Sequence, residues 1–425
     1  MAFNLKLWPL IVLLPAAAFR IHVWVNTQPI VVGRSDTYMQ PAAELLEHGS
    51  YSGAETFRRT PTYPVFLAGT LGVSRGNLRS VTLIQHLLGL ATAAILMRLG
   101  VLLWGSRAAA MAAGALLAFH PKFILYERSI ESELLAVFLL SLTLLLVVKE
   151  AASKLPGSRP LFAAGVIGGA AALARPELAV CMIIFPLFVS TGRGWLKPAA
   201  YFFLPFAVLV AGWMFRNLMV FDSFTLSPMG AITSLQTSGP LIDWEAPTHR
   251  EFKKIYSELV KANGGSHRGG VVNTAIRVMA GENGSKEKFT GALIEAAELG
   301  KETAFRHPLR YLWATRSNFW DFFGSIGGFY VTENGEEREA NLWFPQKHLL
   351  ALALLGLLAA AFSARSKGLL LLSVTALVIT AGSCVVEPGI SRRSLVVVPL
   401  LSLFASYLCV AAGPLFSKLR KPAGL

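Results

Sequence analysis

The sequence contains few charged residues for its length. Asp, Glu, Lys and Arg make up 15% of the 425 residues, whereas apolar types make up 54%. Because water-soluble domains carry roughly a quarter charged residues, this composition excludes a soluble globular protein and a disordered chain. It predicts that lipid covers much of the protein surface.

Cysteine is also scarce, and the sequence lacks recognisable motifs for binding a metal, a phosphate group or a dinucleotide. The three cysteines, Cys181, Cys384 and Cys409, lie within apolar runs, and their odd number indicates neither a disulfide framework nor a zinc site. The eight histidines form no pair at metal-ligand spacing, so neither a metal nor another cofactor is predicted. No glycine-rich phosphate loop, dinucleotide fingerprint or nucleophile elbow occurs. These absences leave no visible site for ATP or for a nucleotide-linked substrate, so any donor substrate is expected to be lipid-borne.

The positive charge is concentrated in the apolar part of the chain. The net charge is +14, yet residues 217–347 hold 15 acidic and 14 basic residues, which leaves 10 acidic against 25 basic residues elsewhere. Lys and Arg beside membrane spans face the cytoplasm and anionic lipid. The basic excess therefore predicts a lipid bilayer partner and no nucleic-acid partner.

The apolar segments predict an all-α polytopic membrane protein with about ten transmembrane helices. They lie at residues 7–25, 80–103, 108–125, 132–148, 161–174, 178–190, 198–215, 348–362, 368–386 and 394–412. Several are shorter than the roughly 20 residues that a bilayer core requires, and the pair around Arg175 also fits a re-entrant hairpin. We expect three units: an N-terminal transmembrane catalytic module (1–216), an extracytoplasmic loop (217–347) and C-terminal helices with a short cytoplasmic tail (348–425).

Basic residues in alternate short loops predict that both termini are cytoplasmic. The first loop (26–79), the turn at 120–131 and the long loop then lie outside. Amphipathic patterns predict outer-face helices at Arg250–Ala262 and Phe289–Phe305. The first apolar run also fits a cleaved signal peptide. An uncleaved first helix, however, is consistent with the orientation that the basic loops predict.

Asp36 directly follows the first predicted span. A carboxylate at this depth suits a general base that acts on an acceptor hydroxyl at the membrane surface. Ser35 or Asp36 would equally serve as the N-cap of a helix over residues 37–48. Both interpretations are open from the sequence alone.

Outward-facing arginines depart from the positive-inside pattern. Arg58 and Arg59 in the first loop are joined by Arg175, Arg216, Arg392 and Arg393. Arginine matches phosphate with two parallel hydrogen bonds, so the set favours a shared anionic ligand. Singly, each arginine also fits snorkelling to lipid headgroups.

The predicted outer turn at 120–131 leads into an acidic stretch at a membrane boundary. Acids beside a span usually face a functional site or a partner charge, although acids in the first turn of a helix also suit its dipole. The four-residue spacing of Glu127 and Glu131 predicts that they share one helical face. Glu133 follows at the start of the next span.

In order and spacing, these segments resemble the GT-C integral-membrane glycosyltransferases, in the branch of the protein O-mannosyltransferases and the lipid A aminoarabinose transferase. The matching residues are Asp36, Arg59-Thr60-Pro61-Thr62-Tyr63-Pro64, Pro121, Tyr126, Ser132-Glu133, Ala174-Arg175-Pro176, Trp213-Met214-Phe215-Arg216-Asn217, Arg392-Arg393-Ser394 and Pro399. Two positions depart from the family pattern: Ser394 stands in place of Tyr, and Asp36 lacks an adjacent second acid.

The resemblance implies a GT-C-like helical bundle and an inverting transfer of sugar from a polyprenyl-phosphate donor to an extracytoplasmic acceptor hydroxyl at a bacterial-type inner membrane. It implies that Asp36 is the general base and that Glu127 or Glu133 positions the acceptor or assists Asp36. The donor phosphate would be bound by Arg59, Tyr63, Arg216 and Arg392, and the outward position of Arg58 suggests the same role. The alternatives are a transporter or flippase, which typically shows related halves, and a polysaccharide polymerase or ligase.

Overall fold

The computed structural model describes residues 7–153, 157–189, 196–268, 270–281, 285–324, 329–331, 337–339, 346–363, 367–386 and 391–412. Its elements are α1 (Leu10–Asn26), α2 (Asp36–His48), α3 (Glu55–Arg58), α4 (Thr62–Val73), α5 (Leu78–Trp104), α6 (Arg107–Ala118), α7 (Pro121–Glu127), α8 (Glu133–Ala151), α9 (Ser158–Ala172), α10 (Leu178–Ile184), α11 (Pro186–Val189), α12 (Leu196–Phe221), α13 (Met229–Ser238), the 3-10 helix η1 (Gly239–Leu241), α14 (Arg250–Ala262), α15 (Val271–Ala280), α16 (Lys286–Arg306), α17 (Pro308–Ala314), α18 (Arg316–Gly324), β1 (Phe329–Val331), β2 (Glu337–Glu339), α19 (Gln346–Ser363), α20 (Lys367–Val386), the 3-10 helix η2 (Ser391–Val397) and α21 (Val398–Ser406). The two short strands pair antiparallel.

The predicted helical, multi-pass membrane architecture is confirmed, but the count of about ten spans is not. Within the described residues, five helical segments are long and apolar enough to cross a bilayer: Leu78–Trp104, Glu133–Ala151, Leu196–Phe221, Gly368–Val385 and Ser394–Ala412. Helices α6 and α7 together would make a sixth span, bent by 54°. The bend falls where His120 precedes Pro121, and a residue before proline disfavours the helical conformation.

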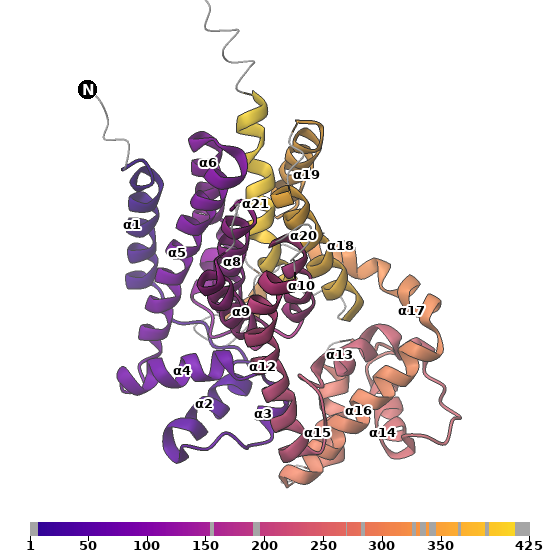
Figure 1. Ribbon diagram of the computed structural model, residues 1–425. Helices are drawn as coiled ribbons and strands as arrows, with labels where there is room; N and C mark the ends of the chain where they lie inside the picture. Colours follow the sequence, from indigo (N-terminus) through magenta and orange to yellow (C-terminus); the bar gives the residue numbers. More distant parts are fainter. Residues whose placement is uncertain are drawn as a thin grey trace, which may run out of the picture.

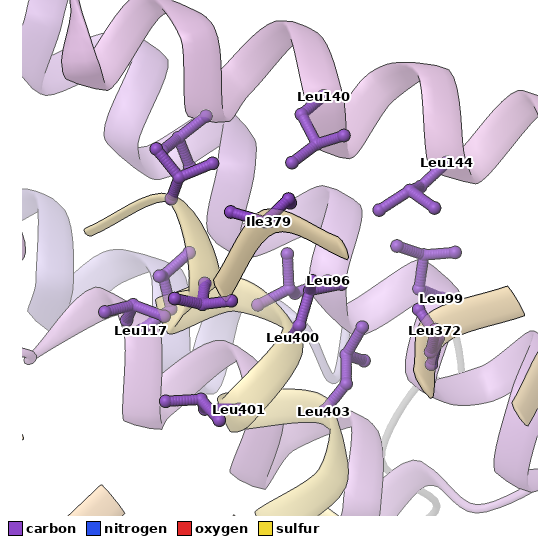
Figure 2. Close-up of a cluster of buried hydrophobic side chains, with 14 of the residues drawn as sticks. Leu96, Leu99, Leu117, Leu140, Leu144, Leu372, Ile379, Leu400, Leu401 and Leu403 are labelled. Atoms are coloured by element: carbon purple, nitrogen blue, oxygen red, sulfur yellow. The ribbon is translucent and has the colours of Figure 1, made fainter. Parts of the chain in front are cut away.

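The bundle core joins helices from both ends of the chain. Figure 2 shows Leu96 of α5, Leu140 of α8, Leu372 of α20 and Leu400 of α21 gathered in one buried cluster. Small residues let other helices approach closely. At Gly165 of α9, for example, a Cβ atom would lie 2.1 Å from a backbone carbonyl oxygen of α12.

The helices of the first loop and the long loop gather at one end of the bundle. Helices α2 to α4 and α13 to α16 lie at the end opposite the N-terminus (Figure 1). The predicted helix at 37–48 is present as α2, and the two predicted amphipathic helices are present as α14 and α16. Helices α13 to α16 pack around their own buried apolar cluster, which includes Phe252, Tyr256, Ile276 and Leu293. The first and long loops therefore meet on one side of the bundle.

Candidate active site

The segment before α2 is held against the segment between α7 and α8. The Ile30 amide donates to the Arg128 carbonyl at 2.8 Å, and the Ile130 amide donates to the Ile30 carbonyl at 3.0 Å. Arg34 forms an ion pair with the buried carboxylate of Glu131. These contacts join two distant parts of the chain and fix the position at which α2 begins.

Asp36 is the first residue of α2 and is exposed to solvent. Ser35 occupies the N-cap position, but its hydroxyl accepts a hydrogen bond from the Val32 amide at 3.1 Å and makes no capping bond to α2. The interpretation of Ser35 as a side-chain cap is therefore not supported. In the described part of the chain, the Asp36 carboxylate makes no ion pair, which leaves it accessible to a ligand.

Arg59 lies directly beside the start of α2. Its Nε donates to the Thr37 hydroxyl at 2.8 Å, and its Nη1 donates to the Tyr38 hydroxyl at 3.2 Å. The guanidinium carbon lies 4.4 Å from the centre of the Tyr38 ring. Among the residues that the structure describes, no carboxylate lies within ion-pair distance of Arg59. Neutral partners therefore hold the Arg59 guanidinium in place without compensating its positive charge.

Arg59 lines a cavity of about 250 Å³ between α2, α8 and the turn after α9. The charged residues around this cavity are Arg58, Arg59, Glu133, Arg175 and Glu177. Arg175 pairs with both carboxylates, at 2.5 Å to Glu133 and 2.6 Å to Glu177.

Arg58 pairs with Glu55 at 3.1 Å. Arg175 carries one positive charge against two carboxylates and Arg58 is paired with Glu55, so Arg59 is the cavity-lining arginine that has no carboxylate within ion-pair distance among the described residues, and it is the one best placed to meet an anion.

Glu127 and Tyr63 lie in a separate buried network. Glu127 contacts Arg20 Nη2 of α1 at 2.7 Å and His86 Nδ1 of α5 at 2.6 Å. The Tyr63 hydroxyl donates to Gln85 Oε1 at 2.9 Å, and Gln85 Nε2 donates to the Glu127 carbonyl at 3.0 Å. This network joins α1, α4, α5 and α7. Through Arg20, this network also anchors α1, the first apolar helix, to the bundle.

Helix α7 ends at Glu127, and α8 begins at Glu133. Glu131 lies between these helices and pairs with Arg34, so the prediction that Glu127 and Glu131 share a helical face is wrong. After Glu127 the chain leaves the helix and bridges Ser129 to Ile30, so the helical repeat stops before Glu131.

Arg216 lies near the end of α12 and contacts the loop between α2 and α3. Its Nη2 donates to the Thr56 hydroxyl at 2.7 Å and to the Tyr51 carbonyl, and its Nη1 donates to Asn217 Oδ1 at 2.8 Å. Arg392 lies in η2, and its side chain lies outside the described residues. Two positions further on, the Ser394 hydroxyl accepts a hydrogen bond from Lys122 Nζ at 2.7 Å.

The structure adds Glu177 and Tyr38 to the cavity residues that the sequence indicated. Arg175, one of the predicted outward arginines, lines the cavity in an ion pair with Glu177, and Tyr38 orients Arg59. The signal for Arg175 was available, because a charge between two apolar segments usually marks a partner or a site. Within the described residues, no three His, Cys, Asp or Glu side chains gather as metal ligands.

Comparisons with known proteins agree with the helical bundle. A family model described as dolichyl-phosphate-mannose-protein mannosyltransferase matches residues 58–215. No curated protein matches the chain by sequence.

Among solved structures, the apo oligosaccharyltransferase of Archaeoglobus fulgidus is 13% identical with a TM-score of 0.59, and the match covers 100% of this chain and 53% of that one. AglB from Archaeoglobus fulgidus, in complex with an inhibitory peptide and a dolichol-phosphate, is 13% identical with a TM-score of 0.53, covering 99% of this chain and 52% of that one.

ArnT from Cupriavidus metallidurans bound to undecaprenyl phosphate is 13% identical with a TM-score of 0.47, covering 96% of this chain and 62% of that one. The chain spans about half the length of the archaeal oligosaccharyltransferases that it matches. The family-model match and the shared fold confirm the predicted resemblance to the GT-C membrane glycosyltransferases.

Proposed function

We propose that this protein is a membrane glycosyltransferase that moves a sugar from a polyprenyl-phosphate donor to an acceptor hydroxyl, with inversion, on the extracytoplasmic face of a bacterial-type inner membrane. The observation that carries this proposal is Arg59, a cavity-lining cation with no ion-pair partner among the described residues, which donates hydrogen bonds to Thr37 and Tyr38 in the turn of α2 that Asp36 begins. The family-model match over residues 58–215 supports the same class of donor.

In the proposed reaction, the acceptor oxygen attacks the anomeric carbon of the sugar while the bond from that carbon to the phosphate oxygen breaks. The bonding electron pair leaves with the polyprenyl phosphate, and Asp36 accepts the hydroxyl proton. Negative charge grows on the departing phosphate in the transition state. Arg59 stabilises that charge because Thr37 and Tyr38 already hold its guanidinium in place.

The remaining candidate residues either line the cavity or lie further away and hold the site in shape. Arg58, paired with Glu55, and the Glu133 to Arg175 pair form part of the cavity lining. Arg216 holds the loop that precedes α3. Tyr63 and Glu127 act as positioning residues through the buried network that joins α4, α5 and α7. Arg392 is proposed as a phosphate ligand on the family motif alone.

The proposal is tested with the purified full chain in lipid nanodiscs. The protein is supplied with undecaprenyl-phosphate-linked glucose, mannose or aminoarabinose and with an envelope extract as acceptor. We expect one donor to release undecaprenyl phosphate while its sugar appears covalently on an acceptor. If donors cross a sealed vesicle bilayer intact and no sugar is transferred, the protein is a transporter and the proposal fails.

Replacing Arg59 by Lys is expected to lower kcat/KM for the lipid-linked donor about a hundredfold, because a single ammonium cannot reproduce the oriented guanidinium. Arg75→Lys is a matched control, since Arg75 is an exposed arginine of the same outer region. Initial rates over a range of donor concentrations measure both effects. A rate for Arg59→Lys equal to that of Arg75→Lys would remove Arg59 from the phosphate site.

A further inference from the structure

A second, larger cavity lies beside the candidate active site. It has a volume of about 810 Å³ and lies between α2 and α3 on one side and α15 and α16 on the other. Cavities of roughly 300–1,000 Å³ typically hold small-molecule ligands. This space is therefore large enough for a sugar with its substituents.

The larger cavity shares a wall with the smaller one. Glu55 lines the larger cavity and pairs at 3.1 Å with Arg58, which lines the smaller cavity. Arg58 also donates to Asn273 Oδ1 of α15 at 3.2 Å. A ligand in the larger cavity would thus lie next to the proposed donor phosphate.

Helix α2 connects this cavity to the proposed base. Gln40 and Glu44 line the cavity, and Asp36, Gln40 and Glu44 follow one another at four-residue intervals. Residues at this spacing lie on one side of a helix. The face of α2 that carries Asp36 therefore continues as a wall of the larger cavity.

The carboxylates of this cavity already have partners within the protein. Glu44 accepts hydrogen bonds from the Ser52 amide at 2.8 Å and the Gly53 amide at 2.9 Å, and Glu55 is paired with Arg58. Burial raises the pKa of Glu44, but hydrogen bonds from Ser52, Gly53 and Ser50 outweigh that effect and hold the pKa below its ordinary value. Glu55 is neutralised by Arg58, whereas Glu44 keeps its negative charge, held in place by neutral donors.

The opposite wall carries two cations without a carboxylate partner among the residues described, and the Lys286 ammonium lies 5.1 Å from the centre of the Phe221 ring. Arg277 of α15 and Lys286 of α16 line the cavity and are exposed, and neither has a carboxylate within ion-pair distance in the described ranges of the chain. Phe289, one helical turn after Lys286, adds an apolar surface on the same wall. Two open cations beside an aromatic ring suit a sugar that bears an anionic group.

We propose that the larger cavity binds the acceptor and that Arg277 and Lys286 select an acceptor sugar carrying a phosphate or carboxylate group. The inference rests on the proposed transferase function, because it assigns the second substrate of that reaction. The anionic sugar belongs either to a soluble glycan or to the headgroup of a glycolipid. Both sources share the chemistry that the two cations recognise.

Direct binding tests this assignment without requiring turnover. The full chain in nanodiscs of neutral lipid is titrated with glucose 6-phosphate, glucuronic acid and glucose, and binding is followed by ligand-observed NMR. We expect the charged sugars to bind about tenfold tighter than glucose or better. The Arg277→Gln/Lys286→Gln double variant should lose this preference. Lys288→Gln, which removes an exposed charge from the same turn of α16, should keep it.

A second arm presents the phosphate on a glycolipid within the nanodisc, beside the same glycolipid without phosphate. A preference seen in this arm alone identifies a glycolipid acceptor, and a preference seen with soluble sugars identifies the soluble source. Equal binding of charged and neutral sugars in both arms, or a preference that survives in the double variant, overturns the assignment. Charge-selective binding by a protein that never cleaves a lipid-linked donor would instead refute the transferase function, and with it the acceptor role, and would leave only the binding of anionic sugars by this cavity.

Discussion

Replacing Asp36 by Asn is expected to lower the rate of sugar transfer by about a hundredfold to ten-thousandfold, the range for loss of a general base. The amide has nearly the same shape as the carboxylate but cannot accept the proton of the acceptor hydroxyl. Because Asp36 is exposed and makes no ion pair with the described residues, the substitution removes no internal contact. The unfolding temperature in detergent should therefore match that of the wild type.

A matched control separates the role of Asp36 from a general loss of negative charge. Glu47 is an exposed acid on the same helix, and its nearest charged partner is His48 at 3.9 Å. Glu47→Gln should transfer sugar at the wild-type rate. Turnover by Asp36→Asn at the rate of Glu47→Gln would show that another group accepts the proton, while a matching fall in both variants would point to an electrostatic effect of α2 as a whole.

Replacing Glu127 by Gln is expected to destabilise the transmembrane bundle by about 3–5 kcal/mol, the typical cost of removing one partner from a buried ion pair. Arg20 and Glu127 have exposed fractions of only 2% and 0%, so no water can compensate the charge that remains. Arg20 keeps its hydrogen bond to the Ala118 carbonyl at 2.9 Å, but its counter-charge is lost. Thermal unfolding in detergent measures the effect.

The double variant Arg20→Met/Glu127→Leu distinguishes a positioning role from a catalytic one. Apolar replacement of both partners of a buried pair is often neutral or stabilising, so we expect the double variant to recover most of the lost stability. It should also recover much of the sugar-transfer activity if Glu127 acts only through the fold. A stable double variant without activity would instead place Glu127 in the chemistry.

The helical elements could be predicted from sequence because their signals are local. The amphipathic repeat of α14 gave its bounds at Arg250–Ala262, and the long apolar runs gave the cores of α5, α8 and α12. The number of membrane spans was harder to predict from the sequence. Segments such as α9 and α10 are apolar yet short, and the bend at Pro121 interrupts a run that appears continuous in the sequence.

The long-range ion pairs, Arg20–Glu127, Arg34–Glu131 and Glu133–Arg175, could not be predicted because their partners are far apart in the chain, whereas Glu55–Arg58 and Arg175–Glu177 are local. Arg20 and Glu127 are 107 positions apart, and no local repeat connects them. The sequence identified Arg58 and Arg59 together as phosphate ligands, but it could not show that Glu55 pairs with Arg58 and that Arg59 has only neutral partners. That distinction depends on how α2, α3 and α8 pack together.

Mass spectrometry of envelope lipids and glycans tests the central claim most directly, in cells that contain the wild-type protein, Asp36→Asn at matched expression, or no protein. A polyprenyl-phosphate sugar should accumulate in both defective strains, and one glycoconjugate should lose a residue of the same mass. This result would identify donor and acceptor together. A deletion strain with a defect, beside an Asp36→Asn strain with a wild-type envelope, would contradict the proposed base and favour transport.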